Sequence, residues 1–84
     1  MLNMISGKRI RMKYMMKLIG MAEHSDPDVR LAAVDAMQRF SDGRVVAPLA
    51  NALEDDDARV ARQARRSLDH LESVVARKGM SSDQ

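Results

Sequence analysis

The chain is short, nearly neutral overall and poor in aromatic residues. It has 84 residues, 14 Lys and Arg against 12 Asp and Glu for a formal net charge of +2, and 8 Met but only one Tyr and one Phe. A chain of this length forms one small domain. Because it contains no Cys, a disulfide scaffold and a Cys-ligated zinc site are both excluded. No stretch approaches the roughly 18 apolar residues needed to cross a bilayer, so we expect no membrane-spanning helix and a cytoplasmic protein.

The first predicted helix covers residues 8–23, after an N-terminal extension at residues 1–7 that is too short to form a full helix and could be a fifth short element. The first twenty residues contain five basic side chains and no acid. Residues 21–58 carry a net charge of −6 and residues 59–84 a net charge of +3. The near-neutral total therefore conceals basic ends around an acidic centre.

The second predicted helix has the clearest start. Asp26 is a good N-cap residue, Pro27 suits the first helical position, and the Asp28 carboxylate favours the positive end of the helix dipole. An unbroken run then predicts a helix over residues 29–40. Nearly all of its faces are apolar, so we expect other elements to cover it on both sides.

Two further helices follow at residues 44–54 and 58–78. Asp42 offers a cap for the first of them, and Pro48 should lie in its first turn or at a local kink. The run Asp55, Asp56 and Asp57 predicts an acidic turn before the last helix. Gly79 marks the expected stop, and residues 80–84 are predicted to be a disordered tail. The domain is thus expected over residues 8–79.

An internal repeat becomes visible when the chain is offset by 31 residues. A period of this length, covering two helices and two turns, is typical of an α-solenoid. The matching pairs are Leu18 with Leu49, Glu23 with Glu54, Asp26 with Asp57, Val29 with Val60, and Ala33 with Ala64.

The segment from Asp26 to Met37, with Val29, Arg30, Ala33 and a preceding Asp-Pro, resembles a HEAT-like repeat of the short kind named after phycobilisome lyases. The likeness covers about residues 9–72. It implies an all-α fold, a short right-handed α-solenoid of about four helices in two pairs. It also implies that Arg30 joins an Asp–Arg ladder between repeats, with Asp26 or Asp57 as its partner.

The two ends of the predicted stack differ. In the last helix the positions of Leu31 and Val34 are taken by Arg62 and Arg65, so we expect this helix to be an exposed end. The first helix carries more apolar surface than one neighbour can cover, unless residues 1–5 fold back over it. The uncovered face predicts self-association as a homodimer. Its predicted contacts are Ile10, Met12, Met15, Met16 and Ile19.

No constellation of catalytic or metal-ligating residues is visible. Glu23 and His24 stand in the reverse order of the His-Glu pairs in HEAT-like hydroxylases, and His70 lies on a charged face. A metal site needs three or four converging ligands. We therefore expect no metal, no cofactor and no enzymatic activity.

Two binding functions remain open. The first is a protein-interaction module, because the second helix of each HEAT pair usually lines the concave face; the predicted partner contacts are Lys13, Met16, Lys17, Gly20, Arg44, Ala47, Asn51 and Glu54. The alternative is nucleic-acid binding by the two basic helices. Its candidate phosphate contacts are Lys8, Arg9, Arg11, Arg59, Arg62 and Arg66.

Overall fold

Four α-helices and one short 3-10 helix form the protein in this computed structural model, which describes residues 2–40 and 42–82, and side chains over residues 9–40 and 42–76. The α-helices are α1 (Leu2–Met21), α2 (Pro27–Met37), α3 (Val46–Ala52) and α4 (Ala58–Ser82), and the 3-10 helix η1 (Gly43–Val45) leads into α3. The described residues contain no strand. The predicted all-α fold of about four helices is confirmed.

Aspartate caps start three of the helices, as the sequence predicts for each turn. In every case the carboxylate accepts a hydrogen bond from the backbone N–H two residues later, which satisfies a donor that the helix itself cannot use. These bonds run from Asp28 to Asp26, from Arg44 to Asp42 and from Arg59 to Asp57, each at 2.9 Å.

The outer helices are longer than predicted. α1 begins at Leu2 instead of residue 8, so residues 2–7 continue the first helix and neither form a separate element nor fold back over it. α4 runs through Gly79 to Ser82, so the predicted stop at Gly79 is wrong and residues 80–82 are helical. A glycine inside a helix costs only about 1 kcal/mol, which is too little to force a stop at either Gly7 or Gly79. Residues 83 and 84 lie outside the described residues.

The inner helices are shorter than predicted. α2 ends at Met37 instead of residue 40, and α3 follows a 3-10 turn and ends at Ala52. Pro48 is the third residue of α3, where its missing N–H removes no hydrogen bond from the helix.

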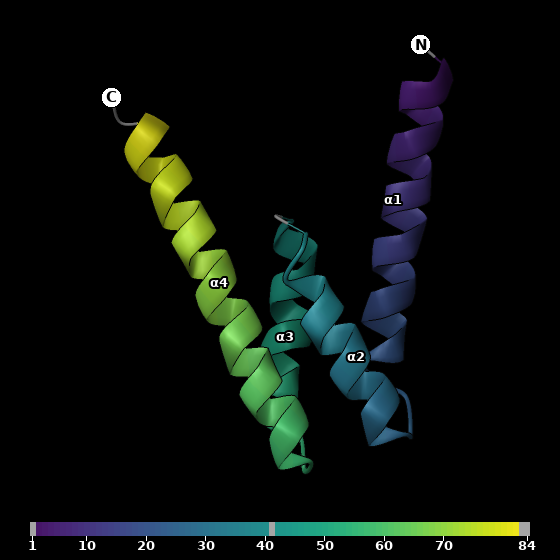
Figure 1. Ribbon diagram of the computed structural model, residues 1–84, viewed down its shortest axis with the longest axis vertical. Coiled ribbons are helices and arrows are strands. Elements are labelled where there is room, and N and C mark those ends of the chain that lie inside the picture. Colours follow the sequence, from purple (N-terminus) through teal and green to yellow (C-terminus); the bar gives the residue numbers. More distant parts are fainter. Residues whose placement is uncertain (1, 41, 83–84) are drawn as a thin grey trace.

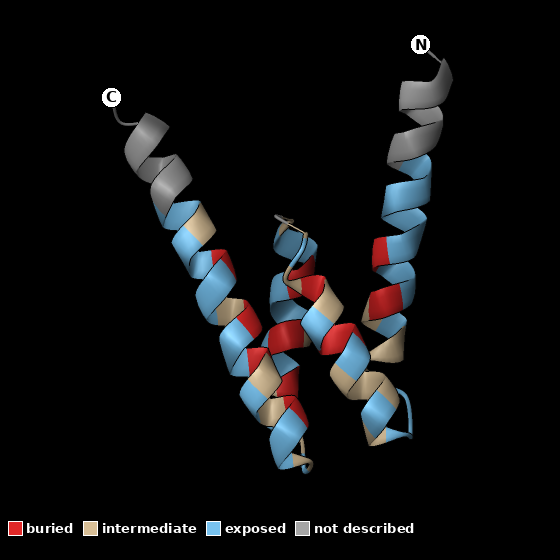
Figure 2. Cartoon of the chain, viewed as in Figure 1, coloured by how far each residue is buried: buried red, intermediate tan, exposed pale blue. Residues whose placement is uncertain are grey.

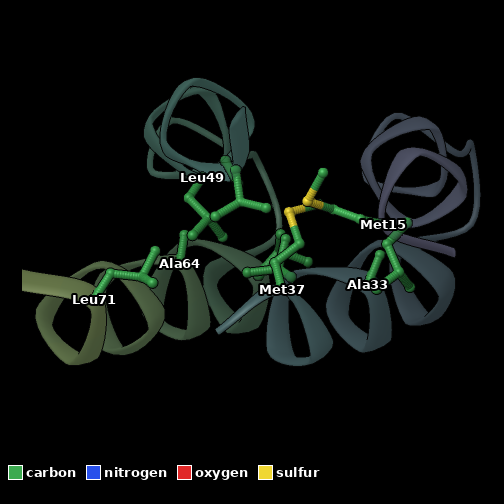
Figure 3. Close-up of a cluster of buried hydrophobic side chains, with 11 residues drawn as sticks. Met15, Ala33, Met37, Leu49, Ala64 and Leu71 are labelled. Atoms are coloured by element: carbon green, nitrogen blue, oxygen red, sulfur yellow. The ribbon is translucent and has the colours of Figure 1, made fainter. Parts of the chain in front are cut away.

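The helices form two layers around one thin core. Figure 3 shows α1 and α3 on one side of the buried side chains and α2 and α4 on the other. Along the stack, α2 packs against both α1 and α4, and α3 packs against α4 (Figure 1). The buried hydrophobic residues are Met15, Leu18, Ala33, Val34, Met37, Val45, Leu49, Ala52, Val60, Ala64 and Leu71.

Burial follows the predicted difference between the second and last helices. Ala33, Val34 and Met37 of α2 are fully buried between its neighbours, whereas Arg62 and Arg65 of α4 are exposed. Buried residues on α4 follow the side that faces α3 and α2 (Figure 2). α4 is therefore the exposed end of the stack, as the sequence predicts.

The two outer helices also project beyond the inner ones. In Figure 1 the first part of α1 and the last part of α4 extend on the same side of the molecule, past the C-terminal end of α2. The short α2 thus leaves part of α1 without a helical neighbour.

Candidate interaction surface

The predicted partner contacts are all accessible. Four of them lie on α1, and the other four lie in η1, α3 and the turn after it, in the same layer of the fold. All eight residues are exposed, namely Lys13, Met16, Lys17, Gly20, Arg44, Ala47, Asn51 and Glu54.

One direct contact joins the two halves of this surface. The Arg44 guanidinium donates a hydrogen bond to the thioether sulfur of Met12, with Nη1 2.8 Å from Sδ. Met12 is predicted from the sequence as a self-association residue, so the structure brings members of two predicted sets together.

The predicted self-association set does not form one exposed face. Ile10 and Met16 are 67% and 52% exposed, but Met15 is only 2% exposed and belongs to the core. Ile19 is partly buried against the same core. Sequence periodicity placed these side chains on one apolar helix, but α2 covers the side that carries Met15. Met15 therefore contributes to the core of this chain, and Ile10 and Met16 are the members of the set most open to a second chain.

The candidate phosphate contacts are divided between opposite ends of the stack. Arg9 and Arg11 are exposed on α1, and Arg62 and Arg66 are exposed on α4, with α2 between the two helices (Figure 1). The side chain of Lys8 lies outside the described residues. The two basic sets therefore do not combine into a single surface.

Arg30 ties the repeats together, but with a partner other than the predicted one. Its guanidinium donates to both carboxylate oxygens of Asp55, at 2.8 and 3.0 Å. It also donates to the backbone carbonyls of His24 and Ser25, at 2.8 and 3.0 Å. The expected pairing with Asp26 or Asp57 is wrong: Asp26 accepts from the backbone N–H of Asp28, and Asp57 pairs with Arg59. The hydrogen bonds from Arg30 lower the pKa of Asp55.

Arg59 forms a second set of ion pairs between the repeats. Its Nη2 lies 2.9 Å from a carboxylate oxygen of Asp28 and 3.0 Å from one of Asp57. The hydrogen bonds that Arg59 donates from its side chain and backbone lower the pKa of Asp57 to about 2, and its side-chain hydrogen bonds to Asp57 and Asp28 raise the pKa of Arg59. Since two carboxylates already pair with Arg59, its guanidinium is less available to a phosphate group.

A cleft of about 600 Å³ opens between α1 and the segment that follows α2. We call it the α1–α2 cleft. Its walls combine apolar side chains with two guanidinium groups and one carboxylate. The lining residues are Arg11, Met12, Tyr14, Met15, Arg39, Phe40 and Asp42.

A second hollow, which we call the α1–α3 groove, is smaller and more polar. Its volume is about 360 Å³, and it is lined by the end of α1, by α3 and by the turns at residues 23–25 and 55–56. The Arg30–Asp55 pair and the predicted partner contact Asn51 border it. The groove places a hydrogen-bonding amide and several charges beside the exposed face of α3.

Sequence reasoning missed Tyr14, Arg39 and Phe40 as surface candidates. The two rings are the only aromatic side chains of the protein, and they pack against each other with centroids 5.9 Å apart and planes tilted by 52°. Phe40 looked like a core residue because the helix was expected to continue through it. With α2 ending at Met37, it sits at the edge of the core instead.

The described residues contain no group of three or more His, Cys, Asp or Glu side chains placed to hold a metal ion. His24 is used locally, since its Nδ1 accepts a hydrogen bond from the backbone N–H of Asp26 at 3.0 Å. None of the helices, over the residues described, is both long and apolar enough to span a bilayer.

Comparison with known proteins supports the repeat fold. A family model for HEAT repeats matches residues 7–77, which is most of the chain. Neither the curated proteins nor the solved structures include a match.

Proposed function

The chain belongs to the HEAT repeat family, and we propose that it is a non-catalytic module that binds another protein through the exposed faces of α1 and α3. HEAT repeats generally act as protein-interaction modules or scaffolds, because stacked helical pairs create extended binding surfaces. The observation that carries the proposal is the exposure, in one layer of the fold, of all eight predicted contact residues.

The chemistry of this surface suits a protein partner of mixed charge. On α1, the exposed Met16 lies among Lys13, Lys17 and Gly20. On the other side, Asn51 and Glu54 extend from α3 and its following turn. A partner that places acidic groups over α1 and polar or basic groups over α3 would be complementary.

Nucleic-acid binding has less support. The two basic sets lie at opposite ends of the stack, and Arg59 is held by Asp28 and Asp57. Between the basic ends, α2 carries the exposed acidic residues Asp28 and Asp35. A phosphate backbone that reached from α1 to α4 would have to cross these acids.

Charge reversal tests the proposal. The variant Lys13→Glu with Lys17→Glu should lose proteins that the wild-type chain captures from source-cell extract, counted by quantitative mass spectrometry. Arg62→Glu with Arg66→Glu on α4 is the matched control and should retain them. The proposal fails if both double variants capture the same proteins as the wild type. If only the α4 variant abolishes binding, and the ligand is an oligonucleotide whose binding fades steeply with salt, the alternative function is correct.

Self-association is tested with the purified chain. Sedimentation velocity over a range of chain concentrations reports whether a dimer forms, and Ile10→Lys should weaken any dimer that uses the exposed side of α1. If Ile10→Lys leaves a dimer intact, the contact lies elsewhere on the molecule.

A further inference from the structure

The α1–α2 cleft lies where α1 extends past the end of the shorter α2. α2 ends at Met37, while the part of α1 that leads to Leu2 extends past this end of α2 (Figure 1). The side of α1 near Met12 therefore faces Arg39, Phe40 and Asp42, which follow α2, instead of a helix. The resulting volume of about 600 Å³ is in the range of pockets that accept a ligand or a few peptide side chains.

The inner surface of the cleft is apolar. Met15, only 2% exposed, joins it to the core. Tyr14 packs its ring against Phe40, and Tyr14 itself remains 52% exposed. Met12, at 39% exposure, completes the wall and supplies a flexible thioether. A large apolar side chain placed here would leave water and contact both rings.

The rim of the cleft is basic. Arg11 and Arg39 are exposed, and the ion pairs found among the described residues involve neither of them. The one carboxylate of the rim, Asp42, already accepts a hydrogen bond from the backbone N–H of Arg44 at 2.9 Å and lies 3.9 Å from its guanidinium. Guanidinium groups bind carboxylates with two parallel hydrogen bonds. The rim therefore favours an anionic ligand.

We propose that the α1–α2 cleft binds an acidic amphipathic segment of a partner protein. A large apolar side chain of that segment enters the cleft against Tyr14 and Phe40, and flanking carboxylates pair with Arg11 and Arg39. This inference rests on the proposed function as a protein-interaction module. It adds a binding site and a ligand chemistry that the predicted contacts on α1 and α3 do not contain.

A second copy of this chain fits the cleft less well. Its most acidic segment, residues 54–57, uses Asp55 and Asp57 in ion pairs within the chain. Its exposed end helix presents Arg62 and Arg65, which would meet the basic rim with like charge. An acidic segment of another protein therefore matches the basic rim better than these parts of a second copy do.

A peptide selection tests the proposal. The full chain is immobilised, and peptides that bind it are selected from a phage-displayed library of short random peptides. Enriched peptides should place Leu, Phe or Met beside at least two acidic residues. Fluorescence anisotropy should show about tenfold weaker binding of these peptides to the variant Arg11→Glu with Arg39→Glu. The variant Tyr14→Ser, which changes no charge, should also bind these peptides more weakly. The control Arg62→Glu with Arg65→Glu, of equal charge change on α4, should bind within about twofold of the wild type.

The proposal is overturned if no peptide is enriched, if enriched peptides lack acidic residues, or if they bind the Arg11 and Arg39 variant as well as the wild type. It is also overturned if the Arg11 and Arg39 variant binds a single-stranded oligonucleotide more weakly than the wild type does, while its binding of the peptides is unchanged. Circular dichroism of each variant verifies that it is folded. If the peptide test fails while Lys13 and Lys17 still control protein capture, the proposed function stands and only the cleft assignment is lost.

Discussion

The hydroxyl of Ser67 is the one buried polar side chain among the described residues, and removing it should measurably loosen the contact between α2 and α4. Ser67 is fully buried, and its hydroxyl donates a hydrogen bond to the backbone carbonyl of Val34 at 2.9 Å. In a longer helix that carbonyl would accept from the N–H of Gln38. Here Gln38 donates to Asp35 instead, at 3.4 Å. Ser67 thus satisfies a carbonyl in the last turn of α2.

The expected loss follows from these partners. Ser67→Ala leaves the buried carbonyl of Val34 without its donor, which costs about 1–3 kcal/mol. Alanine is the better helix former, by roughly 0.5 kcal/mol. The net destabilisation should therefore be about 0.5–2.5 kcal/mol, and each kcal/mol lowers the melting temperature of a domain of this size by about 4–8 °C.

A matched control lies on the same helix. Ser73 is exposed, so Ser73→Ala should only gain helix propensity and stabilise the protein slightly. Thermal and urea unfolding of both variants, followed by far-ultraviolet circular dichroism, gives the two free energies. If Ser67→Ala is at least as stable as Ser73→Ala, the carbonyl of Val34 finds another donor and the argument is refuted.

Three further predictions concern the core and the ion pairs. Met15→Ala should cost about 2–5 kcal/mol in urea unfolding because its side chain is buried, while the exposed Met16→Ala should stay within about 0.5 kcal/mol of the wild type; equal effects would contradict the assignment of Met15 to the core. The pKa of Asp57 is lowered from 3.8 to about 2 in the folded state, so its ionisation contributes stability above pH 3.8 that is lost as the pH falls toward 2. Asp57→Asn keeps a capping side chain but should flatten the fall in the free energy of unfolding across that range, and an unchanged slope in acid titration would exclude this linkage. Arg30→Lys cannot reproduce the paired hydrogen bonds to Asp55 and the two backbone carbonyls, so its urea midpoint should fall more than that of Arg62→Lys; the opposite order would show that the pair is not structural.

The helices themselves could be predicted because local signals and the repeat agree. Asp26, Asp42 and Asp57 each precede a helix and each caps it. The boundaries at the chain ends failed for a simple reason: Gly7 and Gly79 carry only a small penalty inside a helix. Glycine alone therefore does not distinguish a C-cap from an interior position.

The surface was only partly predictable. Exposure of the second helix of each pair follows from the repeat pattern, and all eight predicted contacts are exposed. Met15 was misplaced because helical periodicity shows that a face is apolar, but not which neighbour covers it. The α1–α2 cleft depends on the unequal lengths of α1 and α2, which come from where tertiary packing ends α2, and no local pattern around Tyr14 or Arg39 reports that.

The proportions of the fold also determine how it melts. The Cα atoms span 41 × 34 × 14 Å, so the molecule is a slab whose core is a single layer of side chains. A slab buries less apolar surface per residue than a compact domain of the same length. The heat-capacity change on unfolding and the urea m-value, which both scale with newly exposed surface, should therefore be small for 84 residues. A flat stability curve follows, with broad transitions and only a weak dependence of folding free energy on temperature.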